Sequence, residues 1–214
     1  MTLDLAGHGQ SGTNRQNWTL FSLAQDVVAV ANGLRLKKMI LIGHSLGGPV
    51  SLEAAPLMKG RVLGVILVDT MHDVAQPWEA RAHAEADAED LRQDYKRYFF
   101  DLSSLFSKTS DPSIRHWVEA QAMASNPVPV IALKLSMTNV VPSELFSRAG
   151  VRIRAINAMP PLSPPPTNTE ENKKYADYKV ALIPDAGHFL QLERPLEFNR
   201  ALNQWVRELA ARSP

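Results

Sequence analysis

The stretch Gly43-His44-Ser45-Leu46-Gly47-Gly48 follows directly on the apolar run Lys38-Met39-Ile40-Leu41-Ile42 and precedes a segment with helical periodicity. An apolar strand, a Gly-x-Ser-x-Gly turn and a helix, in this order, are typical of a serine nucleophile held on a sharp turn. The glycines two residues before and after the serine remove side chains that would collide with the neighbouring strand or helix. The pattern predicts an exposed Ser45 hydroxyl, with the Leu46 N–H at the helix start placed to donate to a developing oxyanion. The alternative is an ordinary turn in which a serine caps the helix.

The composition is that of an ordinary globular protein and limits the classes of partner. The 214 residues are 45% hydrophobic and 21% charged, which suffices for one domain with a sizeable core. A net charge of +1 without runs of Lys or Arg argues against a nucleic-acid partner. The chain has no cysteine, so disulfides, thiolate metal sites and a cysteine nucleophile are excluded. Residues 1–5 lack the pattern of a signal peptide and no apolar run reaches the length of a membrane span, so we expect a cytoplasmic protein without a membrane partner, unless the chain starts further upstream.

Five short apolar runs predict buried strands, and several of the segments between them have the spacing of helices. This alternation indicates an α/β fold, a mostly parallel sheet with flanking helices. The predicted strands are residues 1–5, 38–42, 62–68, 151–157 and 179–183. The predicted helices around them are residues 20–34, 46–57 and 195–211.

Between residues 73 and 139 this alternation stops, and charged, aromatic and amphipathic stretches follow one another without a strand-like run. We predict a mostly helical insertion above the carboxyl edge of the sheet, with residues 1–72 and 140–214 forming the core. The aromatic residues of the insertion either face a ligand pocket or form the insertion's own core. They are Trp78, Tyr98, Phe99 and Trp117. Residues 159–167 contain five prolines and predict an extended loop.

Taken together, these segments resemble the α/β-hydrolase family, in the branch that carries a helical cap. Residues 4–11 are similar to the turn after the family's fourth strand, and residues 43–48 to its nucleophile elbow. Residues 187–189 are similar to the loop that bears the catalytic histidine, and residues 193–195 to the lead into the last helix. The order of serine before histidine agrees with the family. The resemblance implies a truncated α/β-hydrolase fold with a helical cap, no organic cofactor and no metal.

His188 gains its predicted role from this context. It follows a predicted strand by a few residues, where a loop can lay the imidazole over Ser45. A neutral imidazole can take the serine proton and return it to the leaving group. His44 is expected to pack beside the nucleophile, and no other histidine has a comparable placement.

The acid of the triad is where the sequence departs from the family. The usual acid follows the predicted strand 151–157, but residues 156–161 contain no carboxylate. Asp69, which ends the strand 62–68, is the best substitute, and some family members resemble that arrangement. It either orients the histidine or caps a strand-end turn, and both interpretations stay open. Asp73 is a weaker candidate, and Asp185 is expected to be a surface turn residue.

A second departure lies at the front of the chain. The family's first three strands have no counterpart in the sequence, nor does the loop that supplies the second oxyanion amide. Either the chain is a fragment of a longer hydrolase, or residues 1–5 pair directly with the strand 38–42. An unpaired edge would leave buried polar groups without partners, so we expect low stability or self-association through that open sheet edge.

The residues favour a serine hydrolase that cleaves a carboxylic ester or similar acyl bond of a small molecule. Ser45 would attack the carbonyl, His188 would act as base and then acid, and Asp69 would orient the histidine. The Leu46 N–H would contribute to the oxyanion hole. Carbon–carbon bond hydrolysis and cofactor-free peroxidation could use the same residues. The alternative from another class is a catalytically impaired binding protein of the same fold.

Overall fold

A four-stranded parallel sheet forms the centre of the protein. The computed structural model describes residues 1–159 and 166–211. The strands are β1 (Met39–His44), β2 (Val62–Val68), β3 (Ile153–Met159) and β4 (Tyr178–Pro184). They lie in the order β1-β2-β3-β4, and every neighbouring pair is parallel. The predicted α/β class with a mostly parallel sheet is therefore confirmed.

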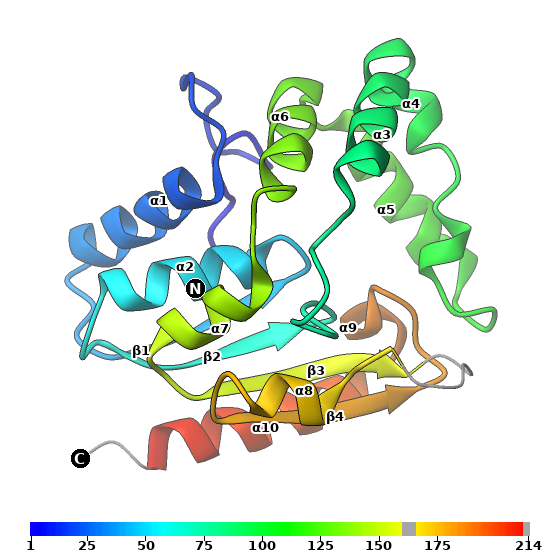
Figure 1. Ribbon diagram of the computed structural model, residues 1–214. Helices are drawn as coiled ribbons and strands as arrows, with labels where there is room; N and C mark the ends of the chain where they lie inside the picture. The colour runs from blue at the N-terminus through cyan, green and yellow to red at the C-terminus, as the bar shows by residue number, and fades with distance from the viewer. Residues whose placement is uncertain (160–165, 212–214) are drawn as a thin grey trace.

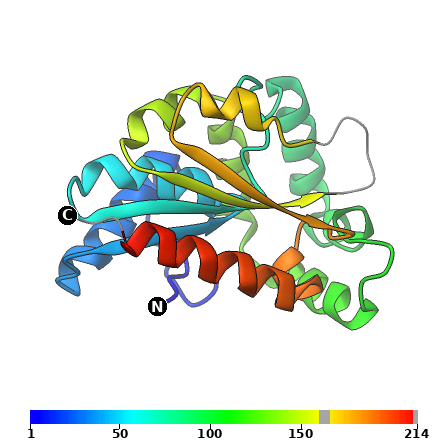
Figure 2. The same ribbon diagram turned by 90° about the horizontal axis from the view of Figure 1, so that it is seen from below.

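Helices cover both faces of the sheet, as buried parallel strands require. The helices α1 (Leu20–Gly33), α2 (Gly47–Leu57) and α7 (Pro142–Ala149) lie on one face, and α10 (Pro195–Ala211) lies on the other (Figures 1 and 2). Two hydrophobic clusters correspond to these two faces. On the α10 face, Trp205 packs in the core and its Nε1–H donates to the Ala155 carbonyl over 3.0 Å.

The segment of residues 73–139, which we call the helical segment, contains no strand. It consists of α3 (Arg81–Gln93), α4 (Tyr95–Tyr98), the 3-10 turn η1 (Ser103–Leu105), α5 (Pro112–Ala124) and α6 (Pro127–Met137). Asp111 and Asn126 cap α5 and α6, each followed by a proline at the first helical position. Figure 1 shows α3, α4 and α5 beyond the end of the sheet to which the strands point.

The predicted strand at residues 1–5 is wrong. These residues adopt no strand, and Met1 is 85% exposed. A local turn uses their polar groups instead: the Asp4 carboxylate accepts from the Gln10 N–H, and the Asp4 carbonyl accepts from the Ser11 hydroxyl. Among the described strands β1 pairs with β2 alone, and a groove of about 810 Å³ runs between β1 and the first five residues.

The remaining differences are in boundaries and in three short helices. The strand predicted at 151–157 begins and ends two residues later, as β3. Its second residue, Arg154, is 1% exposed and pairs with Asp177 and Glu208, which makes a charged residue acceptable inside a strand. The sequence pattern did not indicate α7, α8 (Thr169–Lys173) or α9 (Leu190–Glu193). Most of the loop predicted at 159–167 lies outside the described residues.

Candidate active site

Ser45 lies on a strained turn between β1 and α2. Its φ is +49°, a left-handed value that is uncommon for residues other than glycine, and its N–H donates to the Val68 carbonyl over 3.0 Å. A Cβ on Gly43 would lie 2.1 Å from the carbonyl oxygen of Gly47, so the turn excludes any side chain there. The steric reason expected for Gly47 itself is wrong. A Cβ at this position would meet no atom within 4 Å, because Gly47 faces the groove beside β1.

The Leu46 amide lies at the N-terminal end of α2, directly after Ser45. Leu46 precedes the first residue of α2 and already has helical angles, φ −52° and ψ −33°. Within the described part of the chain its N–H donates to no backbone or side-chain acceptor. The N-terminal end of a helix also carries partial positive charge, which favours a developing anion.

Asp69 and His188 form a direct contact. Asp69 ends β2, with a φ of +45°, and its Oδ2 lies 2.7 Å from Nδ1 of His188. The other carboxylate oxygen accepts the Ala158 N–H over 2.8 Å. The carboxylate is 8% exposed, and burial alone would raise the pKa of Asp69. The hydrogen bonds from His188 and Ala158 and the nearby His72 outweigh burial and hold that pKa below its usual value, so the group is an anion at neutral pH.

His44 holds the histidine loop from the side of the sheet. Its ring lies 4.6 Å from the His188 ring, centroid to centroid, and its Nε2 is 2.8 Å from the His188 carbonyl oxygen. Burial, together with the nearby His188, lowers the pKa of His44 to about 4. The ring is therefore neutral at neutral pH, and its Nε2–H donates to that carbonyl. The expectation that His44 packs beside the nucleophile and is not the base agrees with these contacts.

The helical segment holds the same loop from the opposite side. The His188 N–H donates to the Leu105 carbonyl of η1 over 2.6 Å. Glu193 accepts from the N–H groups of Gly187 and Ser107, at 3.0 and 2.8 Å, and also from the Ser110 hydroxyl. The position of the imidazole thus depends on residues more than 70 positions away in sequence.

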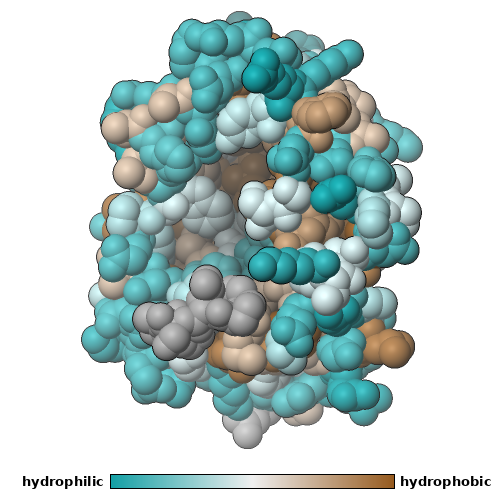
Figure 3. Space-filling model, turned by 90° about the vertical axis from the view of Figure 1, so that its right-hand side faces the viewer, coloured by the Kyte–Doolittle hydropathy of each residue, from teal (hydrophilic) through white to brown (hydrophobic). Residues whose placement is uncertain are grey.

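Ser45, Asp69 and His188 line one cavity of about 420 Å³. Figure 3 shows the molecule hollowed between the helical segment and the sheet, on the side to which the strands point. Trp78 and Pro142 form part of the cavity wall. Within the described residues no hydrogen bond joins the Ser45 and His188 side chains, a separation that is common before substrate binds.

The other candidate residues lie elsewhere or bind other partners. Asp73 lines the cavity, but its carboxylate accepts from the Ala75 N–H and from the Asn168 side chain. Asp185 is an exposed residue with φ +51°, as expected for a surface turn. Of the aromatic candidates, Trp78 faces the cavity, whereas Trp117 is 58% exposed.

Sequence reasoning missed His72 and Glu193. His72 lies three residues after Asp69, and its Nε2 is 3.5 Å from Asp69 Oδ1. The Asp-x-x-His spacing at a strand end was the available signal. Glu193 gave no comparable signal, because its partners Ser107 and Ser110 come from the helical segment.

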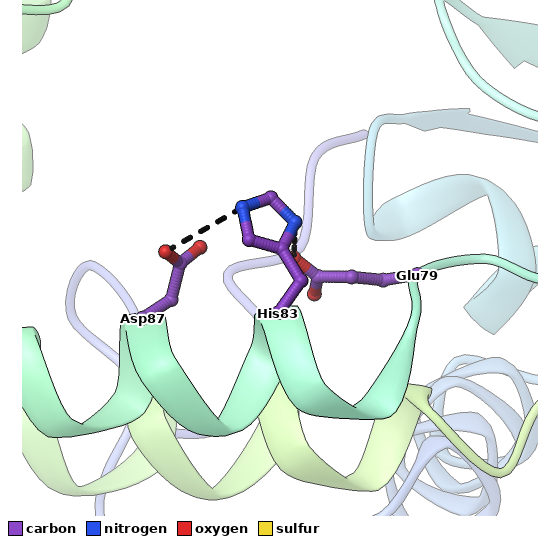
Figure 4. A group of neighbouring side chains, drawn as sticks. All are labelled: Glu79, His83 and Asp87. Atoms are coloured by element: carbon purple, nitrogen blue, oxygen red, sulfur yellow. Dashed lines mark ion pairs between the residues drawn. The ribbon is translucent and has the colours of Figure 1, made fainter.

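A second cluster of titratable groups lies at the start of α3, where Glu79, just before the helix, and His83 and Asp87 on it bring potential metal ligands within 4.8 Å of one another (Figure 4). The Lys134 ammonium of α6 already lies among them. Its Nζ is 2.9 Å from Glu79 Oε1 and 2.7 Å from Asp87 Oδ2, and the Tyr98 hydroxyl also donates to Asp87. The cluster is therefore an ion-pair network that joins α3 to α6, with the lysine as its cation.

The sequence model of the alpha/beta hydrolase family matches residues 1–201. The dihydrolipoyllysine-residue acetyltransferase component of the acetoin cleaving system from Pseudomonas putida is 41% identical over 68 residues, 32% of this chain and 18% of the relative. The protein of the same name from Cupriavidus necator is 24% identical over 208 residues, 95% of this chain and 55% of the relative. This chain thus spans about a fifth to about half of the length of these relatives.

A solved structure, a thermophilic esterase from Thermogutta terrifontis, is similar with a TM-score of 0.79 and 25% identity. The match covers 96% of this chain and 78% of the esterase. None of the described helices is long and apolar enough to cross a membrane. The family match includes the strained turn at Ser45 and the loop at His188, and it extends over most of the sequence. The chain belongs to the alpha/beta hydrolase family.

Proposed function

We propose that the protein is a serine hydrolase that cleaves a carboxylic ester or similar acyl bond of a small molecule. The observation that carries this proposal is the 2.7 Å contact between His188 Nδ1 and Asp69 Oδ2, in the same cavity as the strained Ser45. An imidazole whose Nδ1–H is held by a buried anion presents Nε2 as a base. The acid then follows β2, and Asp69 takes the role that the strand β3 leaves without a carboxylate.

The proposed reaction has two halves. The Ser45 hydroxyl attacks the carbonyl carbon while His188 Nε2 takes its proton, and the Leu46 N–H stabilises the oxyanion of the tetrahedral intermediate. The intermediate collapses, His188 returns the proton to the leaving alkoxide, and an acyl-serine remains. Water, deprotonated by the same imidazole, then attacks the acyl group and releases the acid and the free serine. Asp69 stays ionised throughout and stabilises the imidazolium.

We further propose that the helical segment acts as a cap domain. It supplies Trp78 to the cavity wall and holds the His188 loop through Leu105 and Ser107. A cavity of about 420 Å³ fits a small ester better than a long acyl chain or a polymer.

Labelling by a fluorophosphonate, with turnover of p-nitrophenyl acetate and butyrate, tests the proposal. We expect one label per chain, located on Ser45, and we expect the label and the turnover to be lost together in Ser45→Ala. Ser147→Ala is the matched control, since this hydroxyl bonds only within α7. A chain that neither reacts with the probe nor hydrolyses either ester would be a binding protein of this fold.

The second candidate, a catalytically impaired binding protein, is favoured by one observation. The groove of about 810 Å³ beside β1 reaches Ser45 and Leu46, on the side where the family resemblance puts the second oxyanion amide. Leu46 alone would leave the oxyanion with one backbone donor. Loss of one such donor costs roughly a hundredfold or more in rate, so measured turnover separates the two candidates.

We also propose that the free edge of β1 is the surface for self-association. Ile42 on this strand is 50% exposed, and unpaired strand edges readily pair with another chain. Size-exclusion chromatography over a range of concentrations tests this, with Ile42→Lys expected to shift the elution toward monomer. Elution as a monomer at every concentration would contradict it.

A further inference from the structure

His72 is a half-buried titratable residue that the proposed reaction does not use. It follows β2 by four positions and lines the cavity with Asp69. Its Nε2 lies 3.5 Å from Asp69 Oδ1, while His188 binds the opposite oxygen, Oδ2. The carboxylate therefore lies between two imidazoles.

Behind His72 a short chain of buried polar groups continues to β3. The Nδ1 of His72 is 2.9 Å from the Thr167 hydroxyl, and Asn157 Nδ2 donates to that same hydroxyl oxygen over 3.1 Å. Asn157 is fully buried and Thr167 is 6% exposed. Buried groups of this kind are normally present to make a defined hydrogen bond, because an unused one is costly.

The direction of this chain follows from the proton count. Since the Thr167 oxygen accepts from Asn157, the single hydroxyl proton is free to donate to His72 Nδ1. A neutral imidazole with Nδ1 as acceptor carries its proton on Nε2, which faces Asp69. With the Asn157 amide reversed, its oxygen would accept the Thr167 hydroxyl proton, and Thr167 would in turn accept from His72 Nδ1–H. The unprotonated Nε2 of His72 would then point its lone pair at the Asp69 carboxylate, which is repulsive. Burial lowers the pKa of His72, which agrees with a neutral ring.

We propose, building on the function proposed above, that His72 is a positioning residue for the triad. The Ala158 N–H donates to Oδ1 of Asp69, and the His72 Nε2–H faces the same oxygen from 3.5 Å, so that Oδ2 stays aimed at His188. Thr167 and Asn157 set the tautomer that His72 needs for this. The role is electrostatic and orientational, and His72 takes no proton from the substrate.

One variant at Thr167 and two at His72 test the proposal. Thr167→Val keeps the side-chain shape but removes the hydroxyl, and Thr167 does not line the cavity. We expect kcat to fall about threefold to tenfold with KM unchanged, as for the loss of one buried hydrogen bond. His72→Phe should lower kcat about tenfold or more, and His72→Gln, which keeps an N–H donor, should recover part of the loss. His116→Gln, an exposed residue of α5, is the control.

The ¹⁵N NMR spectrum of the histidine side chains gives a readout that a purely structural role would not move. We expect His72 to be the Nε2–H tautomer in the parent protein and to become a mixture of tautomers in Thr167→Val, while melting temperatures stay close. A His72 ring protonated at Nδ1, or unchanged kcat in both Thr167→Val and His72→Phe, would overturn the proposal. The function proposed above fails separately, if Asp69→Asn and Ser45→Ala keep the parent's turnover. The NMR spectrum reports the tautomer of His72, and with it the hydrogen bond from Thr167, in that case too.

Discussion

Asp69 and Asp87 both face histidines, but their surroundings differ in charge. Asp69 is 8% exposed and faces two imidazoles and one backbone amide. Asp87 lies in the network of α3, where the Lys134 ammonium is 2.7 Å away and the partner His83 is 70% exposed. Hydrogen bonds from Lys134 and Tyr98 hold the pKa of Asp87 below its usual value, against the opposing effect of burial.

The difference is one of net charge. At Asp69 hydrogen bonds stabilise the negative charge of the carboxylate without neutralising it. The charge therefore remains available to stabilise an imidazolium. At Asp87 a lysine neutralises the charge, and what remains is an attachment between two helices. Under the proposed function, the same residue types serve catalysis in one place and packing in the other, and the predictions below test this division.

The largest effect is expected at Ser45, whose proposed activation depends on Asp69 through His188. Ser45→Ala should lower ester turnover at least about a thousandfold, because no other group in the proposed reaction can form the acyl intermediate. Alanine suits the turn nearly as well, so circular dichroism and melting temperature should be unchanged. Turnover equal to that of the parent would remove Ser45 from the mechanism.

Asp69→Asn and Asp87→Asn test the comparison directly. We expect Asp69→Asn to lower kcat by about a thousandfold to ten-thousandfold, because His188 loses its orienting anion. Asp87→Asn should leave kcat within about a factor of two, since its charge is already neutralised. Steady-state kinetics on the purified variants measures both values.

Asp73→Asn is the control for the assignment of the acid. Asp73 lines the same cavity but is bonded to Ala75 and Asn168. A large loss of kcat in Asp73→Asn, with the kcat of Asp69→Asn near that of the parent, would assign the role of the acid to Asp73 and not to Asp69.

The sequence predicted the elements that local pattern determines. Apolar runs and the Gly-x-Ser-x-Gly turn located β1, β2 and α2, because strand burial and turn geometry both depend on adjacent residues. Residues 1–5 were mispredicted, because these residues lie across a groove from β1 without pairing with it, and a local turn takes up the polar groups of Asp4. Met1 is 85% exposed here.

The site followed the same division between local and distant determinants. Ser45 and His188 were predicted from the residues beside them in sequence. Asp69 was predicted as one of two open interpretations, and its contact with His188 spans 119 positions. The tie between Glu193 and Ser107 spans 86 positions, and no short-range pattern indicates it.

A smaller effect, measured on stability, is expected at His44. Its pKa is about 4 in the folded protein and about 6.5 when unfolded. Between these values the unfolded chain binds the proton and the folded chain does not, so stability falls as the pH drops from about 6.5 to about 4. The shift corresponds to up to about 3 kcal/mol over that window.

His44→Gln should remove this part of the pH dependence. Urea unfolding midpoints at pH 7.5 and 4.5 measure it, as the difference between the parent and the variant. His83→Gln, which replaces an exposed ring in the network of α3, is the matched control. Equal pH dependence in the parent and in His44→Gln would show that the ring is protonated without cost beside His188.

The smallest effect is expected in the network of α3. Lys134→Met should lower stability by about 1 kcal/mol, or a few degrees in melting temperature, because the pairs with Glu79 and Asp87 are only partly buried. Ester turnover should stay near that of the parent.

The position of Lys134 also predicts whether the cluster binds a metal ion. Zn²⁺ should not raise the melting temperature of the parent, because the ammonium already pairs with the carboxylates. Lys134→Met removes the ammonium from among Glu79, His83 and Asp87, so Zn²⁺ should raise the melting temperature of this variant. An equal rise in melting temperature in both proteins would mean that Zn²⁺ displaces the lysine ammonium from the carboxylates. Lys134 would then neutralise Asp87 less firmly than its 2.7 Å distance indicates, and the difference in charge between Asp87 and Asp69 would be smaller.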